Sequence, residues 1–286
     1  MFKIINSNCI ENGPKLALRY KNATPFPHIR LGSFLEKNIA QKAFKEFPMY
    51  SNPIWNHHKH FNCQKLSANK KEHFPKTIRS IVDELNSNRF ASWLSKLVGI
   101  PDLRPDPSLM GGGLHQITRG GYLNMHADFT YHHHNEKLKR RVNLLLYLNK
   151  EWKQDWGGQI EFWDEGMKEC ITKSPPLGNN AVIFSTSKTS WHGHPAPLSC
   201  PQGHTRNSIA LYYYTEEKRP TQRMGVTTFR HLHEDGLLKK LFISLDQKVL
   251  YLYSRSKQIF GLSNDDWVTK FLNKIEKLFS IFKKKE

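Results

Sequence analysis

The chain has 286 residues, a formal net charge of +18, and a composition that is 38% apolar, 12% aromatic and 24% charged. This length is enough for one large domain or two small ones with a substantial core, and the aromatic content excludes an intrinsically disordered chain. No apolar run approaches the length of roughly 18 residues expected of a membrane-spanning helix. The N-terminal segment also lacks the apolar stretch of a secretory signal, so we expect a cytoplasmic protein.

The cysteines and the positive charge limit the kind of protein and the partners that this chain could have. The four cysteines are scattered without a C-x-x-C pair, which predicts reduced thiols and no disulfide framework; they are Cys9, Cys63, Cys170 and Cys200. The charge permits an anionic partner but does not identify one. Because no long basic run is interleaved with aromatic residues, a solvated surface is favoured over a nucleic-acid interface.

Residues 1–107 read as an N-terminal support region of mixed strand and helix. The segment "PHIRLGSF" predicts a short strand, and apolar spacing predicts an amphipathic helix over 36–47. One or two further helices are predicted over 73–100, where Ile78, Ile81, Val82 and Leu85 recur at helical spacing. The prolines at 105–107 mark the boundary of this region.

Residues 108–216 differ in composition from the preceding region. They contain short segments rich in β-branched and aromatic residues, separated by Gly, Asn and Pro. Strands are predicted at 113–118, 122–129, 141–148, 158–163, 180–185, 190–192 and 206–215. This spacing favours a mainly β core, a sandwich or jelly roll, over a parallel sheet with helical crossovers.

Residues 217–286 read as a helical C-terminal extension with an excess of basic residues. Ser263 followed by two aspartates is a typical helix start. Two placements of this extension are open. Its helices lie on an acidic membrane surface, or they pack against the β core or between two copies of the chain.

The segment "LNMHADF" carries His126 and Asp128 two residues apart on a predicted strand, so both side chains project from one face. They are either a hydrogen-bonded pair or two ligands of a metal. The downstream segment "SWHGH" offers His192 and His194 as a third ligand. Two histidines and one carboxylate with open positions form the facial triad of mononuclear non-haem iron oxygenases.

The last predicted strand, "RNSIALYYY", places Arg206 and Ser208 on one face. An arginine inside a β core carries a high desolvation cost unless a carboxylate meets it. A dicarboxylate that bridges a metal and this guanidinium would remove that cost.

In chain order, "GGYLNMHADF", "RRVNLLLYLNKEW", "WGGQIEFWD", "SWHGH" and "RNSIALYYY" resemble the Fe(II)/2-oxoglutarate dioxygenases, in their prolyl 4-hydroxylase-like branch. The resemblance covers about 109–215, with an entry strand and helix near "FPHIRLGSFL". It implies a double-stranded β-helix (jelly-roll) core over 108–216, with iron(II), 2-oxoglutarate and O₂ as its cofactor and co-substrates and ascorbate as a candidate reductant.

Carried over by position, the resemblance implies residue roles. It makes His126, Asp128 and His192 the iron ligands, with His194 a loop histidine. It implies that Arg206, Ser208 and Tyr147 contact 2-oxoglutarate, and that Gln116 stands where relatives have a tyrosine in that contact. Tyr131 and Trp191 are weaker candidates for substrate binding.

The implied reaction is hydroxylation of a C–H bond, with a prolyl residue of a peptide or protein as the expected substrate. A small molecule or a sugar-containing intermediate is the alternative substrate, since fold and cofactor do not determine it. Two other classes remain, a cupin-like binding protein without catalysis and a zinc enzyme on a similar barrel. Neither of these has a need for a buried arginine on the last strand.

Overall fold

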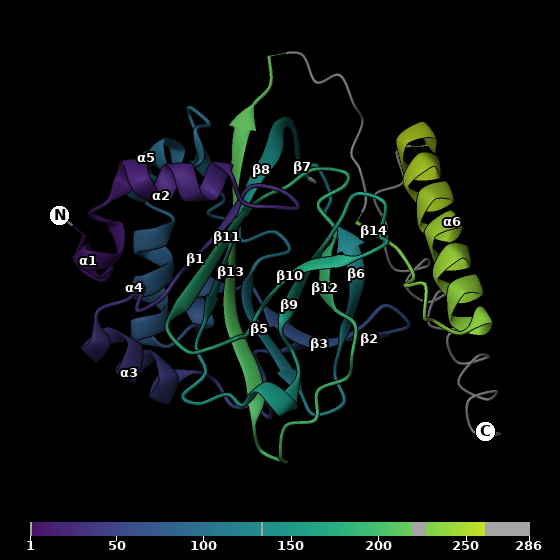
Figure 1. Ribbon diagram of the computed structural model, residues 1–286, viewed down its shortest axis with the longest axis horizontal. Coiled ribbons are helices and arrows are strands. Elements are labelled where there is room, and N and C mark those ends of the chain that lie inside the picture. The colour runs from purple at the N-terminus through teal and green to yellow at the C-terminus, as the bar shows by residue number, and fades with distance from the viewer. Residues whose placement is uncertain (1, 133, 219–226, 261–286) are drawn as a thin grey trace.

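The computed structural model of the protein describes residues 2–132, 134–218 and 227–260. A two-layered β structure forms its centre, with α1–α5 gathered on one side and α6 on the other (Figure 1). The helices are α1 (Ser7–Ile10), α2 (Gly13–Lys21), α3 (Lys37–Glu46), α4 (Lys76–Leu85), α5 (Asn88–Val98) and α6 (Leu237–Phe260). The fold is the predicted mainly β jelly roll with flanking helices.

One layer, the major sheet, pairs its strands antiparallel in the order β1-β11-β8-β13-β5-β3. Their bounds are β1 His28–Leu31, β11 Asn180–Ser185, β8 Asn135–Tyr147, β13 Thr205–Glu216, β5 Gly113–Thr118 and β3 Cys63–Ala68. Three further strands join this sheet: β2 (Asn56–His60) on β3, β4 (Arg104–Pro105) on β13 and β7 (Tyr131–His132) on β8.

The other layer, the minor sheet, pairs in the order β10-β9-β12-β6. Its strands are β10 Cys170–Ser174, β9 Ile160–Trp163, β12 His192–His194 and β6 Leu123–Ala127, and β14 (Thr228–Phe229) adds to β6. Strand β3 pairs with β5 of the major sheet and, through Cys63 opposite Leu123, with β6 of the minor sheet. The β2–β3 hairpin therefore joins the two layers along one side.

Alternating side chains give the major sheet one face toward the helices and one toward the interior. On β8 and β13, Leu144, Leu146, Ile209 and Leu211 belong to the large apolar core shared with the helices. The residues between them point the other way, because successive side chains of a strand alternate. That inner face carries Asn143, Tyr147, Arg206, Ser208 and Tyr212, with Ser208 directly opposite Tyr147.

The helices that cover this sheet follow the predicted apolar spacing. Helix α3 lies within the predicted 36–47, and α4 buries all four apolar residues expected of it. The boundary between α4 and α5 is set by Ser87, whose hydroxyl accepts a hydrogen bond from the Phe90 amide at 3.2 Å. Gly99 ends α5 in the left-handed conformation with φ 70°.

The β structure extends beyond the predicted range of 108–216. Strands β1 and β3 lie within the first 107 residues, and they pair with β11 and β5 respectively. Sequence patterning did not predict β2 and β3, because the segment "NHHKHFNCQKLSA" lacks the apolar alternation of a half-buried strand. Strand β10 was not predicted for the same reason, since "CITKS" has one strongly apolar residue.

The described part of the C-terminal extension packs against the β core. Phe242 of α6 contacts Phe61 with ring centroids 5.4 Å apart, and Ile243 is 1% exposed. The Asn62 side-chain amide also donates a hydrogen bond to Asp246 at 2.5 Å. The predicted helix after Ser263 lies outside the described residues. Within those ranges, no helix is both long and apolar enough to cross a membrane.

Candidate functional site

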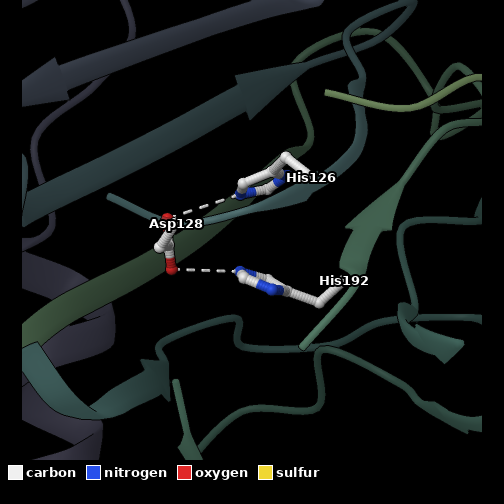
Figure 2. A group of neighbouring side chains, drawn as sticks. All are labelled: His126, Asp128 and His192. Carbon is white, nitrogen blue, oxygen red and sulfur yellow. Dashed lines mark ion pairs between the residues drawn. The ribbon is translucent and has the colours of Figure 1, made fainter. Parts of the chain in front are cut away.

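Three side chains converge inside the β core from two strands of the minor sheet and the segment after β6 (Figure 2). His126 on β6 and His192 at the start of β12 lie opposite each other in the strand pairing. Asp128 follows β6 and faces both rings, with oxygens 3.7 Å from Nε2 of His126 and 3.3 Å from Nε2 of His192. One ligand atom from each residue lies within 4.8 Å of the others, which is the arrangement of a metal-binding cluster.

The two histidines are oriented for metal binding by their own backbone. Nδ1 of His126 lies 2.9 Å from the carbonyl of Asn124, and Nδ1 of His192 lies 2.9 Å from the carbonyl of Ser190. A proton on Nδ1 that is donated to a carbonyl leaves the Nε2 lone pair directed at the cluster. Burial, together with the neighbouring His192, lowers the pKa of His126 to about 3. His126 is therefore a neutral ligand at physiological pH.

Asp128 is held by two residues of β8. The Asn143 side-chain amide donates a 2.6 Å hydrogen bond to Oδ2 of Asp128, and Arg140 donates to the same oxygen at 3.1 Å. Arg140 also donates from Nε to the side-chain oxygen Oδ1 of Asn143 at 2.8 Å. Burial by itself would raise the pKa of Asp128, but the charge of Arg140, with the His192 ring close by, holds it well below its ordinary value. The carboxylate is thus ionised and fixed in place.

Asn143→Leu is expected to weaken Mn(II) binding by about 10- to 100-fold, because residues that orient a metal ligand contribute on that scale. The leucine keeps the volume of Asn143 and leaves Asp128 with Arg140 alone. Titration of the metal-free protein with Mn(II) checks this, with Asn135→Leu as the matched control on an exposed end of the same strand. Equal affinities in the two variants would show that Asn143 does not position the carboxylate.

Arg206, on the inner face of β13, is 5% exposed. Its guanidinium donates to the Gly158 carbonyl at 2.8 Å and to the Tyr147 hydroxyl at 3.0 Å. No carboxylate pairs with it among the described residues. Burial lowers the pKa of Arg206, and the contact with Tyr147 opposes that effect in part. A buried cation without a counter-ion is a ready binding partner for a ligand carboxylate.

His194 is a second buried group without a partner. It is 4% exposed, and neither ring nitrogen has a hydrogen-bond partner within the described ranges. It lies two residues after His192 on β12, and both Arg206 and His126 act electrostatically on it. Unpaired buried polar atoms of this kind mark a place where a ligand or water belongs. The donor set from His126 to Arg206 therefore fits a divalent metal with a dicarboxylate beside it.

Residues 112–214 match the family model described as the 2OG-Fe(II) oxygenase superfamily. This stretch is a 2OG-Fe(II) oxygenase domain. The cofactor and co-substrates of such a domain are iron(II), 2-oxoglutarate and O₂, which agrees with the donor set found inside the β core.

The chain is similar to two curated relatives and to solved structures of the same fold. It is 26% identical over 231 residues to the prolyl 3-hydroxylase OGFOD1 of Xenopus laevis, covering 76% of this chain and 41% of that protein. It is 29% identical over 150 residues to the Mus musculus protein of the same name, covering 51% of this chain and 24% of that one. The chain thus spans less than half the length of the curated relatives it matches.

Two solved structures share the fold of the oxygenase domain. A Pseudomonas putida prolyl-4-hydroxylase superposes with a TM-score of 0.51 at 15% identity, covering 71% of this chain and all of that one. A Trichoplax adhaerens prolyl hydroxylase, solved with a peptide of hypoxia inducible factor, gives 0.52 at 16% identity, covering 73% and 93%. At these identities the likeness establishes the jelly-roll fold alone.

The structure does not bring Gln116 to the site of the oxygenase domain. Gln116 is opposite Asn207 on β13, and its side-chain amide donates to the Pro48 carbonyl and to Asn207, both at 3.0 Å. This is the outer face of β5, away from Arg206. Its neighbour His115 is opposite Ser208 and faces the interior instead. The expected contact of Gln116 with the co-substrate is therefore wrong. Side chains alternate along β5, so Gln116 points away from the interior while His115 points into it.

The two weaker candidates for substrate binding are also misplaced. Trp191 precedes His192 and packs on the outer side of the minor sheet with Met125 and Trp163, while its indole donates to the Glu165 carbonyl at 3.0 Å. Tyr131 is 1% exposed on β7 and has no surface to offer a substrate. His194, expected in a loop, is instead the buried strand residue described above.

Sequence reasoning missed several groups that surround the site. Arg140 and Asn143, which hold Asp128, lie 12 and 15 residues after it, too far for a local motif to connect them. Lys65 and His115 reach the interior from β3 and β5, and Arg206 acts electrostatically on both. The signal that could have found Arg140 and Asn143 is a polar residue within a strand that otherwise reads as apolar. Their shared inward direction depends on the register shift between β8 and β13 at Tyr213 and Tyr214, which spacing along one strand does not reveal.

Proposed function

We propose that this chain is an Fe(II)- and 2-oxoglutarate-dependent dioxygenase that hydroxylates a C–H bond. The observation that carries the proposal is the pairing of a His-Asp-His cluster with a buried arginine that has no carboxylate partner among the described residues. A dicarboxylate co-substrate bound at the metal through one end and at Arg206 through the other uses both features at once.

In this proposal, His126, Asp128 and His192 hold iron(II), while Arg206 and Tyr147 bind the distal carboxylate of 2-oxoglutarate, with Ser208 facing Tyr147. Iron, 2-oxoglutarate and O₂ together would supply the oxidising chemistry: one oxygen atom of O₂ enters succinate as CO₂ is released, and the other enters the substrate C–H bond. The chain fixes the imidazole tautomers and keeps the carboxylate ionised. The apolar cluster that contains Tyr147, made of Ile160, Phe162, Val182 and Phe184, excludes water beside the co-substrate.

For the prime substrate, we propose a prolyl residue of a peptide or protein, because both curated relatives are prolyl 3-hydroxylases. A small-molecule substrate is the alternative. A cupin-like binding protein without catalysis, or a zinc hydrolase, would not need Arg206 as a buried cation, and this observation favours the oxygenase over both.

Anaerobic addition of Fe(II) and 2-oxoglutarate to the purified protein tests the cofactor site. We expect a weak visible charge-transfer band that is absent from His192→Ala and weakened in Arg206→Ala. The partly exposed His204 and the exposed Arg104 lie outside the site and provide matched controls, so His204→Ala and Arg104→Ala keep the band. Succinate release after O₂ is admitted then reports turnover. Absence of both signals in the wild-type protein would rule out this function.

Gly158→Ala is expected to weaken 2-oxoglutarate binding by about tenfold and to destabilise the fold by about 1–2 kcal/mol. Gly158 has φ +74°, and an added Cβ would meet Leu198 at 2.7 Å and the Arg206 side chain at 3.1 Å. Gly203→Ala is the matched control, since its φ is +87° but nothing lies within 4 Å of the added carbon. Calorimetric titration and urea unfolding separate the two effects. If both variants lose only stability, contact with Arg206 does not matter for binding.

A further inference from the structure

Lys65 on β3 points into the same interior as the oxygenase site. In the pairing of β3 with β5, Ser67 is opposite His115, and in the pairing of β5 with β13, His115 is opposite Ser208. Lys65 lies two residues from Ser67 and so shares the inner face. Its ammonium acts electrostatically on His126 and His194 and is itself influenced by Asp128 and Arg206.

Lys65 has no counter-ion in this interior. Its ammonium makes no hydrogen bond or ion pair with any residue that the structure describes. The one carboxylate whose charge favours its protonated form is that of Asp128, which is already paired with Arg140. Burial lowers the pKa of Lys65, as expected for an ammonium that lacks a partner. An anion beside Lys65 would stabilise the charged ammonium and raise its pKa again.

Three groups that can hydrogen-bond to an anion surround Lys65. Nε2 of His58 lies 2.7 Å from the hydroxyl of Ser67, and His58 is opposite Lys65 in the β2–β3 hairpin. His115 is close enough that the charge of Lys65 lowers its pKa, after the larger effect of burial. All four side chains are partly exposed, so a ligand can reach them from solvent.

The proposed co-substrate does not account for Lys65. One carboxylate of 2-oxoglutarate is assigned to the metal and the other to Arg206. The charge of iron(II) and that of the 2-oxoglutarate dianion cancel, and Asp128 is paired with Arg140, so Lys65 and Arg206 are left as cations without a carboxylate partner among the described residues. An additional negative charge is therefore favoured beside the co-substrate.

We propose that Lys65, with His58 and His115 beside it, is a binding subsite for a carboxylate or phosphate carried by the prime substrate. This inference rests on the proposed function, because it takes the co-substrate to lie at Arg206. Under a prolyl substrate, the anionic group belongs to a residue next to the proline. The position on the β2–β3 hairpin places this anion between the solvent and the metal cluster.

Calorimetric titration of the protein loaded with Mn(II) and saturated with 2-oxoglutarate tests the subsite. The first probe is inorganic phosphate, and the second is a pair of capped dipeptides, prolyl-glutamate and prolyl-glutamine. We expect phosphate to bind at one site, with affinity reduced at least about tenfold in Lys65→Met. Lys59→Met is the matched control, because Lys59 is an exposed lysine of the same hairpin, and it binds as the wild type does.

The peptide pair identifies the source of the anion. Tighter binding of the glutamate peptide, lost in Lys65→Met, assigns a carboxylate-bearing substrate, whereas a response to phosphate alone assigns a phosphate-bearing one. If neither probe distinguishes Lys65→Met from Lys59→Met, the proposal is overturned. It is also overturned if Lys65→Met weakens 2-oxoglutarate binding before any probe is added, since Lys65 would then serve the co-substrate. Failure of the wild type to bind 2-oxoglutarate overturns instead the proposed function.

Discussion

Asp128→Asn is expected to abolish 2-oxoglutarate turnover and to lower the free energy of unfolding of the metal-free protein by about 3 kcal/mol. The two losses have separate causes. Turnover fails because the cluster loses its anionic ligand. Stability falls because Arg140, which is 2% exposed, keeps its charge but loses the carboxylate that compensates it. Urea unfolding without metal and succinate release with iron measure the two effects.

His192→Gln and the double variant Asp128→Asn/Arg140→Met are the controls for this prediction. His192→Gln removes a ligand without leaving a buried charge unpaired, so turnover should fail while the metal-free stability changes little. The double variant removes the unpaired cation together with its partner, so stability should recover while turnover does not. If Asp128→Asn unfolds at the same urea concentration as the wild type, the ion pair with Arg140 is not a source of stability.

Arg206→Met is expected to change function and stability in opposite directions. Affinity for 2-oxoglutarate should fall by at least about 100-fold, because truncating one partner of a buried charge pair costs several kcal/mol. The ligand-free protein should become more stable by about 1–2 kcal/mol, since a methionine fills the space without the desolvation cost of an unpaired guanidinium. Titration with 2-oxoglutarate in the presence of Mn(II), and urea unfolding in its absence, provide the two measurements.

Arg104→Met is the control for this second prediction, because Arg104 is an exposed arginine paired with Glu216 at 2.6 Å. It should alter neither quantity by more than a few tenths of a kcal/mol. A loss of stability in Arg206→Met would mean that the contacts with Gly158 and Tyr147 outweigh the cost of burying the charge. Arg206 would then be a structural residue first and a ligand-binding residue second.

The sequence predicted the strands of the central β region because most of them bury apolar or aromatic residues in regular alternation. It also predicted that His126 and Asp128 share a face, since that follows from spacing within one strand. What it could not determine was which face of a different strand turns inward. Gln116 and His115 are adjacent, and only the pairing of β5 with β13 shows that His115 faces the interior.

The same limit explains why the sequence did not predict that polar residues from the first 107 positions reach the interior. A lysine and several histidines on one hairpin read as a solvated loop, because strand patterns are recognised by buried apolar side chains. Lys65 faces inward because β3 is held between β5 and β6. That environment is set by residues 50 and more positions away, so no local pattern contains it.

The position of β3 between the two sheets also determines which fragment of the chain can be made as an independent protein. The family match begins at residue 112, after β1, the β2–β3 hairpin and α2–α5. A product cut at that boundary would lose one wall of the barrel and expose the edges of β5 and β6 as unpaired backbone. Such a truncation would be prone to aggregate, and a soluble expression boundary has to be sought before β1.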